Sequence, residues 1–154
     1  MKLRIVCAGK IKDKWLSDGI AEYSKRVSKY AKVEIVEVAD SPDTLPTAQA
    51  LDQEGKRMLA RIGAGDYVIV MDLHGKQFTS EEWSEHMIHA FEKGGAEIVI
   101  VIGGSCGLSP ELVERANERI CLSKMTYTHQ MTRLIILEQV YRAFKIHYGE
   151  KYHK

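Results

Sequence analysis

Two loops with small or hydroxyl-bearing side chains are the parts of this chain best suited to hold a small ligand. Gly103-Gly104-Ser105-Cys106-Gly107 follows the apolar run Ile98–Ile102, and Leu122–Gln130 opens a long amphipathic segment. Glycine lets backbone amides approach a ligand closely because it has no side chain. In open α/β sheets, ligands bind outside the carboxyl ends of the strands, where such loops lie. The two loops therefore predict a ligand pocket; the alternative is a tight turn that binds nothing.

The glycine loop also matches G-x-S-x-G, the nucleophile elbow of hydrolases, with Ser105 as the nucleophile. Glu138 and His153 follow it in the chain order of a serine-acid-histidine triad. Against this, the chain is short for an α/β-hydrolase, and the helix expected at Ser109-Pro110 begins several residues after the serine. A serine hydrolase stays a minor alternative.

Other ligand classes lack their usual residues. The chain has neither the G-x-x-x-x-G-K-[ST] phosphate loop nor the G-x-G-x-x-G pattern of dinucleotide-binding folds. Cys106 and Cys121 have no close Cys or His partners of the kind that a zinc site requires. We therefore predict no metal site and no dinucleotide fingerprint.

Charged side chains interrupt the apolar last segment at Arg133, Glu138 and Arg142. Glu138 and Arg142 are four residues apart, so they share one helix face and can pair, as ordinary surface pairs also do. The tail Tyr152-His153-Lys154 offers a ring, an imidazole and a cation, which suit an RNA base and its phosphates. The alternative for this tail is the disorder common at termini.

Composition favours one domain of 154 residues with an ordinary apolar fraction of 45%. The net charge is only +1, but the segment from Lys124 to the end has six Lys or Arg and two acids, which predicts a phosphate-contacting face or a solvated helix. No apolar run is long enough for a membrane helix, Met1–Val6 lacks a signal-peptide layout, and three scattered cysteines favour reduced thiols. We expect a cytoplasmic protein that binds no membrane.

Hydrophobic periodicity alternates between strands and helices along the chain. Continuous apolar strands of this kind predict an α/β fold with a mostly parallel sheet flanked by helices. The Asp72–Lys76 stretch is expected to be a turn, and Ala48, Leu51, Met58, Leu59 and Ile62 are expected to face the core. The expected strands are 3–7, 33–38, 67–71, 97–102 and 120–122, and the expected helices begin near 13, 47, 79, 109 and 130.

Several long motifs in order resemble the RlmH (YbeA-type) ribosomal RNA methyltransferases of the SPOUT superfamily. They are Ile102–Leu108, Leu122–Arg133, Glu138–Ile146 and Gly149–His153, and the similarity extends to Met1-Lys2-Leu3 and Asp72-x-x-Gly75-Lys76. The resemblance covers the whole chain, residues 1–154, as one SPOUT methyltransferase domain. It implies a deep trefoil knot in the C-terminal part, which the periodicity does not reveal.

The resemblance also implies a cofactor, a substrate and a quaternary structure. The cofactor would be S-adenosylmethionine, and the product N3-methylpseudouridine in 23S ribosomal RNA of the assembled 70S ribosome. The enzyme would be a homodimer in which the tail of one subunit completes the site of the other. By motif match, the cofactor contacts would be Met71, Gly103 and Leu122, Ser123, Lys124, Met125, Thr126, Tyr127.

Methyl transfer needs an aligned nucleophile and, at the N3 of a uracil-type ring, help in removing a proton. We expect Tyr152, His153 and Arg142 to supply this help, with Glu138 orienting Arg142. We expect His129 and Arg133 to lie near the cofactor or RNA phosphates, and Lys124 and Lys154 to contact phosphates. The alternative from another class is a ribosome-associated or RNA-binding factor that has the fold but no catalysis.

Overall fold

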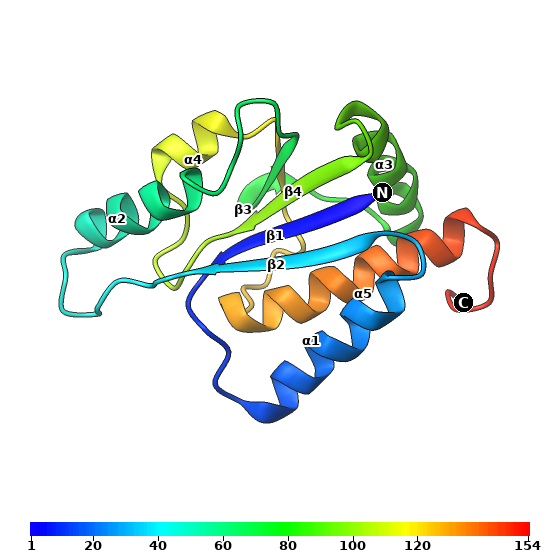
Figure 1. Ribbon diagram of the computed structural model, residues 1–154, viewed down its shortest axis with the longest axis horizontal. Coiled ribbons are helices and arrows are strands. Elements are labelled where there is room, and N and C mark those ends of the chain that lie inside the picture. The colour runs from blue at the N-terminus through cyan, green and yellow to red at the C-terminus, as the bar shows by residue number, and fades with distance from the viewer.

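The computed structural model describes residues 1–154, and strands and helices alternate along them (Figure 1). None of the helices combines the length and the apolarity needed to cross a membrane. The elements are β1 Lys2–Ala8, α1 Lys14–Val27, β2 Lys32–Val38, α2 Thr47–Leu59, β3 Val68–Lys76, α3 Ser80–Lys93, β4 Glu97–Ile102, α4 Pro110–Arg115, β5 Glu118–Ile120 and α5 His129–His147.

All five strands are parallel in the order β2-β1-β4-β3-β5, which confirms the predicted α/β class. Successive side chains of a strand point to opposite faces, and both faces are buried here, which explains the unbroken apolar runs. In β4, Ile98 and Ile100 pack with α1, α3 and α5, whereas Val99 and Val101 pack with α2 and α4. The trefoil knot stays a prediction.

The start of α2 is confirmed, and its inward face in part. Met58 is buried, and Leu59 and Ile62 pack against the same core cluster, whereas Ala48 is exposed and the helix ends at Leu59. A side chain on Gly55 would collide with the Ser109 hydroxyl, so close packing of α2 on the next loop depends on this glycine. Glu54 and Gly55 belong to the buried face of α2, and a search for apolar residues at helical spacing does not find them. The buried residues of α2 are Ala50, Glu54, Gly55 and Met58.

Strand β3 continues to Lys76, so the predicted turn at Asp72–Lys76 is wrong. A Cβ on Gly75 would lie 2.5 Å from the backbone nitrogen of Ile120, because β5 passes directly against it. Lys76 pairs with Ile120 across an irregular register, and β5 begins at Glu118 rather than Ile120. The glycine therefore marks a close strand approach, and not a reversal of the chain.

The helix starts predicted near residues 79 and 109 are confirmed. Thr79 and Glu82 form a capping box at the start of α3, and Ser109 accepts a hydrogen bond from the backbone N–H of Leu112, with Pro110 in the first turn of α4. Asp13 precedes α1 but makes no side-chain cap. The caps at Thr79 and Ser109 fix where the loops after β3 and β4 end and where α3 and α4 begin.

Candidate functional site

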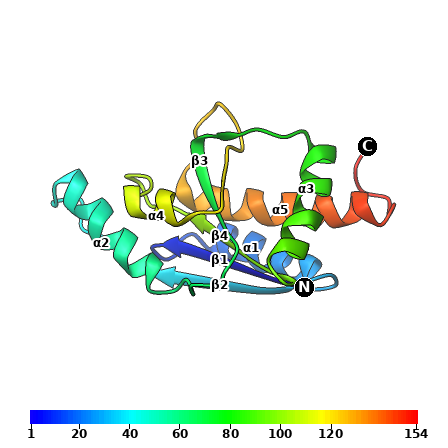
Figure 2. The same ribbon diagram turned by 90° about the horizontal axis from the view of Figure 1, so that it is seen from above.

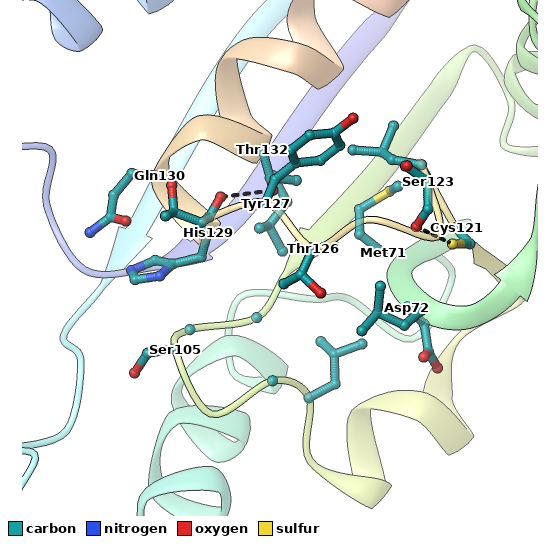
Figure 3. Close-up of a pocket in the computed structure, with 18 of the residues that line it drawn as sticks. Met71, Asp72, Ser105, Cys121, Ser123, Thr126, Tyr127, His129, Gln130 and Thr132 are labelled. Atoms are coloured by element: carbon teal, nitrogen blue, oxygen red, sulfur yellow. Dashed lines mark hydrogen bonds between the residues drawn. The ribbon is translucent and has the colours of Figure 1, made fainter.

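A cavity of about 710 Å³ opens at the carboxyl ends of β3 and β4, the edge at which ligands bind in parallel sheets. Three segments enclose it: the second half of β3, the glycine loop after β4, and the loop between β5 and α5. Figure 3 shows Met71 at the centre, with Thr126 extending from the third segment toward the glycine loop. The predicted ligand pocket is therefore present.

The glycine loop forms one wall through backbone rather than side chains. A Cβ on Gly103 would fall inside van der Waals contact with the carbonyl oxygen of Gly107, so only glycine fits there. Gly107 has a φ of +93°, and its N–H donates to the Gly104 carbonyl at 3.0 Å. The loop is a tight turn and a pocket wall at once, so the two interpretations of the glycines do not compete.

Glu54 supports this loop from behind, which the sequence did not suggest. Its side chain is buried at 4% exposure, and Oε1 accepts the backbone N–H of Ser41 at 2.9 Å. A Cβ on Gly104 would approach Oε2 to 2.6 Å, and Oε2 has no hydrogen-bond partner. The carboxylate therefore braces the back of the glycine loop and ties it to the β2–α2 loop.

The opposite wall is shaped by local hydrogen bonds of hydroxyl and thiol groups (Figure 3). The Cys121 thiol donates to the Ser123 carbonyl at 3.0 Å, and the Ser123 hydroxyl accepts the N–H of Met125 at 3.0 Å. Thr128 caps α5 by accepting the N–H of Met131, and the Thr132 hydroxyl donates to the Thr128 carbonyl at 2.9 Å. Short polar side chains in this loop hold its shape and leave its inner face to a ligand.

Seven of the eight residues expected to contact the cofactor line the cavity, and Lys124 does not. The Lys124 side chain is exposed, so it remains a candidate for phosphate contact only. Several lining residues belong to the quoted motifs but were not named as cofactor contacts, among them Asp72, Ile102, Leu108, Gln130 and Thr132. Sequence reasoning missed Ile120 and Cys121, where adjacency to the end of a strand was the available signal.

Two lining residues carry ionisable groups whose pKa is displaced. Burial opposes the charge of Asp72, but hydrogen bonds from the His74 N–H and from Arg119 outweigh it and lower the pKa of Asp72. Burial first and the charge of Arg133 second lower the pKa of His129, so its imidazole is neutral at pH 7. Asp72 is already occupied by its partners, whereas the neutral imidazole of His129 can accept a proton at pH 7.

Arg133 does not face solvent, contrary to the expected RNA contact. Its side chain is 1% exposed, and Nη2 donates to the carbonyls of Ala8 and Gly9 at 2.7 and 2.9 Å. Nη1 donates to Glu37 at 2.8 Å. A guanidinium enclosed in this way has no group to offer RNA phosphates, so Arg133 fixes the start of α5 against the end of β1.

A second cluster of polar groups lies at the other end of α5, where the tail folds back. Arg142 pairs with Glu138 and donates to Nδ1 of His153 at 3.2 Å, while Nε2 of His153 lies 2.8 Å from Glu81. The Tyr152 hydroxyl donates to Glu138 at 3.0 Å, and the Arg142 guanidinium covers the Tyr152 ring at 4.8 Å. The four side chains expected to be catalytic are therefore assembled, and the tail is ordered.

The charges of this tail cluster are well defined. An arginine only donates, so Nδ1 of His153 accepts from Arg142, which places the imidazole proton on Nε2. Burial, then hydrogen bonds to Tyr23 and Glu138, raises the pKa of Tyr152, and the bond to Glu138 raises the pKa of Arg142. At pH 7 the cluster thus presents a neutral phenol and a fixed cation.

The pocket and the tail cluster stand apart in one chain. Gln130 lines the pocket and Arg142 holds the tail, and twelve residues of helix between them span about 18 Å. Figures 1 and 2 show the glycine loop and the start of α5 at one end, with the C-terminus at the other. Within one chain this separation keeps Ser105 away from Glu138 and His153, so a single subunit does not assemble the hydrolase triad, and Figure 3 shows the Ser105 hydroxyl turned away from Thr126.

A smaller cleft of about 220 Å³ between α3 and α5 continues from the pocket toward the tail cluster. It shares Cys121, Leu122 and Tyr127 with the pocket and ends at Ser80 and Gln139, next to Glu138. No three His, Cys, Asp or Glu side chains gather as a metal ion would require.

The fold and the pocket define a class: a parallel α/β protein with a cavity walled by backbone at its strand ends. The family model described as "Predicted SPOUT methyltransferase" matches residues 1–153. The chain belongs to the SPOUT methyltransferase family, which confirms the resemblance.

Individual relatives agree over their whole length. Proteins named "Ribosomal RNA large subunit methyltransferase H" from Streptococcus thermophilus (strain CNRZ 1066) and Carboxydothermus hydrogenoformans are 45% and 46% identical to this chain, covering 100% of both partners. A solved structure of a probable methylase family protein from Haemophilus influenzae Rd KW20 matches with a TM-score of 0.56 at 16% identity, over 99% of this chain and 70% of that chain. This last likeness shows the fold alone.

Proposed function

We propose that this protein transfers a methyl group from S-adenosylmethionine to N3 of a pseudouridine in 23S ribosomal RNA of the assembled ribosome. The observation that carries the proposal is the glycine-walled cavity at the ends of β3 and β4 in a chain of the SPOUT methyltransferase family. The names of full-length relatives at about 45% identity support large-subunit ribosomal RNA as the substrate.

The residues present fit S-adenosylmethionine. The wall at Gly103 is a cradle that a single Cβ would fill, and the opposite wall presents backbone from Leu122 to Tyr127. Met71 and Leu108 add apolar surface, which suits an adenine ring. When bound, S-adenosylmethionine supplies an electrophilic methyl group on a sulfonium.

The tail cluster supplies the remaining chemistry in this proposal. Arg142, held by Glu138, stabilises the anion that forms when the uracil-type ring loses its N3 proton. Nδ1 of His153 accepts that proton once Arg142 has turned from the imidazole to the substrate. Tyr152, which stays a neutral phenol, donates a hydrogen bond and gives the base a ring to pack on.

A homodimer brings the two halves together. Antiparallel packing of two α5 helices exchanges their ends, so each tail reaches the pocket of the other subunit. Met131 and Ile135 lie one turn apart on α5 and are only partly buried in the single chain, which leaves apolar surface for such a contact. Residues 1–154 act as one methyltransferase domain of a trefoil-knotted subunit, and the substrate places the reaction in the cytoplasm.

The test uses isolated 70S ribosomes that lack the modification. Wild-type protein and labelled S-adenosylmethionine should methylate 23S RNA at one pseudouridine, with the nucleotide identified by mass. Free 23S RNA and separated 50S subunits serve as controls for the requirement of the assembled ribosome. Calorimetric titration with S-adenosylmethionine tests the alternative function, because a non-catalytic RNA-binding factor needs no affinity for it. Binding without transfer to any ribosomal particle would contradict the proposal.

A further inference from the structure

An exposed tryptophan stands in the first turn of α1, outside the lining of the pocket. Trp15, in the first turn of α1, is 62% exposed, whereas the only other tryptophan, Trp83, is 5% exposed. Tryptophan buries more apolar surface than most side chains, so exposure to this degree is unusual in a folded domain.

The packing of α1 on α5 fixes where Trp15 lies. The two helices run in the same direction (Figure 1): a Cβ on Gly19 would lie 3.4 Å from Leu134, and further along Tyr30 stacks on Phe144 at 5.0 Å. One turn back from this first contact, Trp15 is level with Gln130, which lines the pocket. Trp15 and the pocket therefore belong to the same end of the α1–α5 layer.

Lysines surround this indole. Lys10, Lys12 and Lys14 are exposed, and Lys10 and Lys12 form no ion pair. Lys14 pairs with Asp18 at 2.6 Å, but side chains 87% and 62% exposed hold each other only weakly. Asp13 is the one acid within Lys10–Trp15, so the segment keeps a net charge of +2.

The residue before this segment, Gly9, is held by α5. Gly9 has a φ of +83°, which turns the chain out of β1, and the buried Arg133 holds its carbonyl oxygen. Arg133 stands one turn after His129, a pocket residue on the same helix. A ligand that contacts Lys10–Trp15 is therefore placed at a fixed position relative to the cofactor pocket.

We propose that Lys10–Trp15 is an RNA-docking surface, on which an unpaired base stacks on Trp15 and neighbouring phosphates contact Lys10, Lys12 and Lys14. Base stacking on an exposed aromatic ring flanked by cations is how proteins hold single-stranded RNA. The partner subunit's tail is a poorer occupant, because Lys151 and Lys154 would meet like charges. The inference rests on the proposed function, since it supplies a position for the RNA beside the methyl donor.

Fluorescence of Trp15 gives a direct test. The probe is an RNA hairpin with a loop of unpaired uridines, compared with a blunt duplex of the same stem. The hairpin should quench the wild-type signal and the duplex should not, while Trp15→Phe assigns the change to this indole against the buried Trp83. Trp15→Ala should weaken hairpin binding about tenfold, within the range for one stacked base. Unquenched fluorescence at saturating hairpin would overturn the proposal.

Salt dependence tests the lysines. The triple variant Lys10→Gln, Lys12→Gln, Lys14→Gln should reduce the slope of log affinity against log salt by about 0.7 for each phosphate that the protein no longer neutralises. The control variant Lys25→Gln, Lys29→Gln, Lys32→Gln makes the same charge change at the far end of α1, and its slope should match that of the wild type. Equal slopes for both triple variants would contradict a local phosphate contact.

Two further measurements separate the remaining outcomes. Quenching by polyglutamate as strong as that by the hairpin would indicate an acidic protein as the occupant and overturn the proposal. A changed sedimentation coefficient of the Trp15→Ala protein would indicate a second copy of this chain and would also overturn it. Methyl transfer to 70S ribosomes is measured in parallel. If the wild type methylates 70S ribosomes and Trp15→Ala methylates them equally fast, the docking surface is refuted and the proposed function is not. If the hairpin quenches Trp15 but the protein methylates no ribosome, the proposed function is refuted and the docking surface is not.

Discussion

The two ends of α5 carry the two halves of the candidate site, and they are built by different means. At the pocket end, glycines and capped turns shape a cavity through backbone, and the ionisable Asp72 is already paired. At the tail end, Glu138, Arg142 and His153 form a network of charged and polar side chains. We therefore expect cofactor binding to depend on the shape of the pocket, and proton transfer to depend on the side chains of the tail. Variants at the two ends of α5 should separate cofactor affinity from the rate of methyl transfer.

Removal of the tail should give the largest effect and the cleanest separation. A chain without Tyr152-His153-Lys154 loses the imidazole and the phenol, so methyl transfer should fall by about 10²- to 10⁴-fold, as for a lost acid–base group. Affinity for S-adenosylmethionine should stay within about twofold of wild type, since the cavity is enclosed by β3, the glycine loop and the β5–α5 loop without any residue of the tail. The double variant Tyr152→Phe, His153→Gln keeps the packing of the ring on Tyr141 and should show the same loss. Full activity of both variants would remove the tail from the mechanism.

Gly103→Ala should affect the other half. The added methyl group collides with the Gly107 carbonyl, so the loop must move and cofactor affinity should fall by about a hundredfold in calorimetry, a loss of about 2.7 kcal/mol. Gly65→Ala is the matched control, because a Cβ there meets nothing within 4 Å. Retained affinity in the Gly103 variant would mean that the cavity is not the cofactor site.

Arg133 connects the pocket end to the sheet, so its replacement should act on stability. Arg133→Met removes three hydrogen bonds and leaves the carbonyls of Ala8 and Gly9 without their donor. We expect the free energy of unfolding to fall by about 3 kcal/mol in urea titration. Arg26→Met, which breaks an exposed pair with Glu22, should cost below about 1 kcal/mol. Equal losses in the two variants would contradict the structural role of Arg133.

The smallest expected effect is a pH dependence of cofactor binding through His129. Its folded pKa lies below the ordinary value of 6.5, so the imidazole is neutral at pH 7 and gains a proton only as the pH falls further. Protonation adds a cation next to Arg133 and a cationic sulfonium, so affinity should be flat from pH 7 to 8 and fall by less than about tenfold in acid. Since the unfolded chain binds this proton more readily, His129 also lowers stability below pH 6.5. His129→Gln should flatten the pH dependence of cofactor affinity and of stability below pH 7. If affinity still falls in acid as it does in the wild type, a group other than His129 causes the fall.

The sequence predicted the features that follow from local pattern. Continuous apolar strands indicated the parallel sheet, and Ser109-Pro110 marked the start of α4 because capping is local chemistry. It failed where a tertiary contact reverses a local rule. Gly75 is a close approach to β5 and not a turn, and Arg133 is an internal anchor and not a surface cation.

The candidate site shows the same division. The lining of the pocket by Gly103 and by Leu122–Tyr127, apart from Lys124, was expected from the family motifs. The position of Glu54 was not, because a buried acid in a helix resembles a surface residue in the sequence. The motifs also did not show that the pocket and the tail cluster lie at opposite ends of α5, because the motifs give residue types and not positions in space.

A heterodimer of two inactive chains tests the central claim, that the pocket of one subunit works with the tail of the other. Gly103→Ala and the tail-truncated chain, co-expressed with different tags and purified through both, form a dimer with one intact pocket and one intact tail. If they act across the interface, this dimer contains one complete site and should methylate 70S ribosomes at about half the wild-type rate. Activity no higher than that of either variant alone would contradict a site shared between subunits.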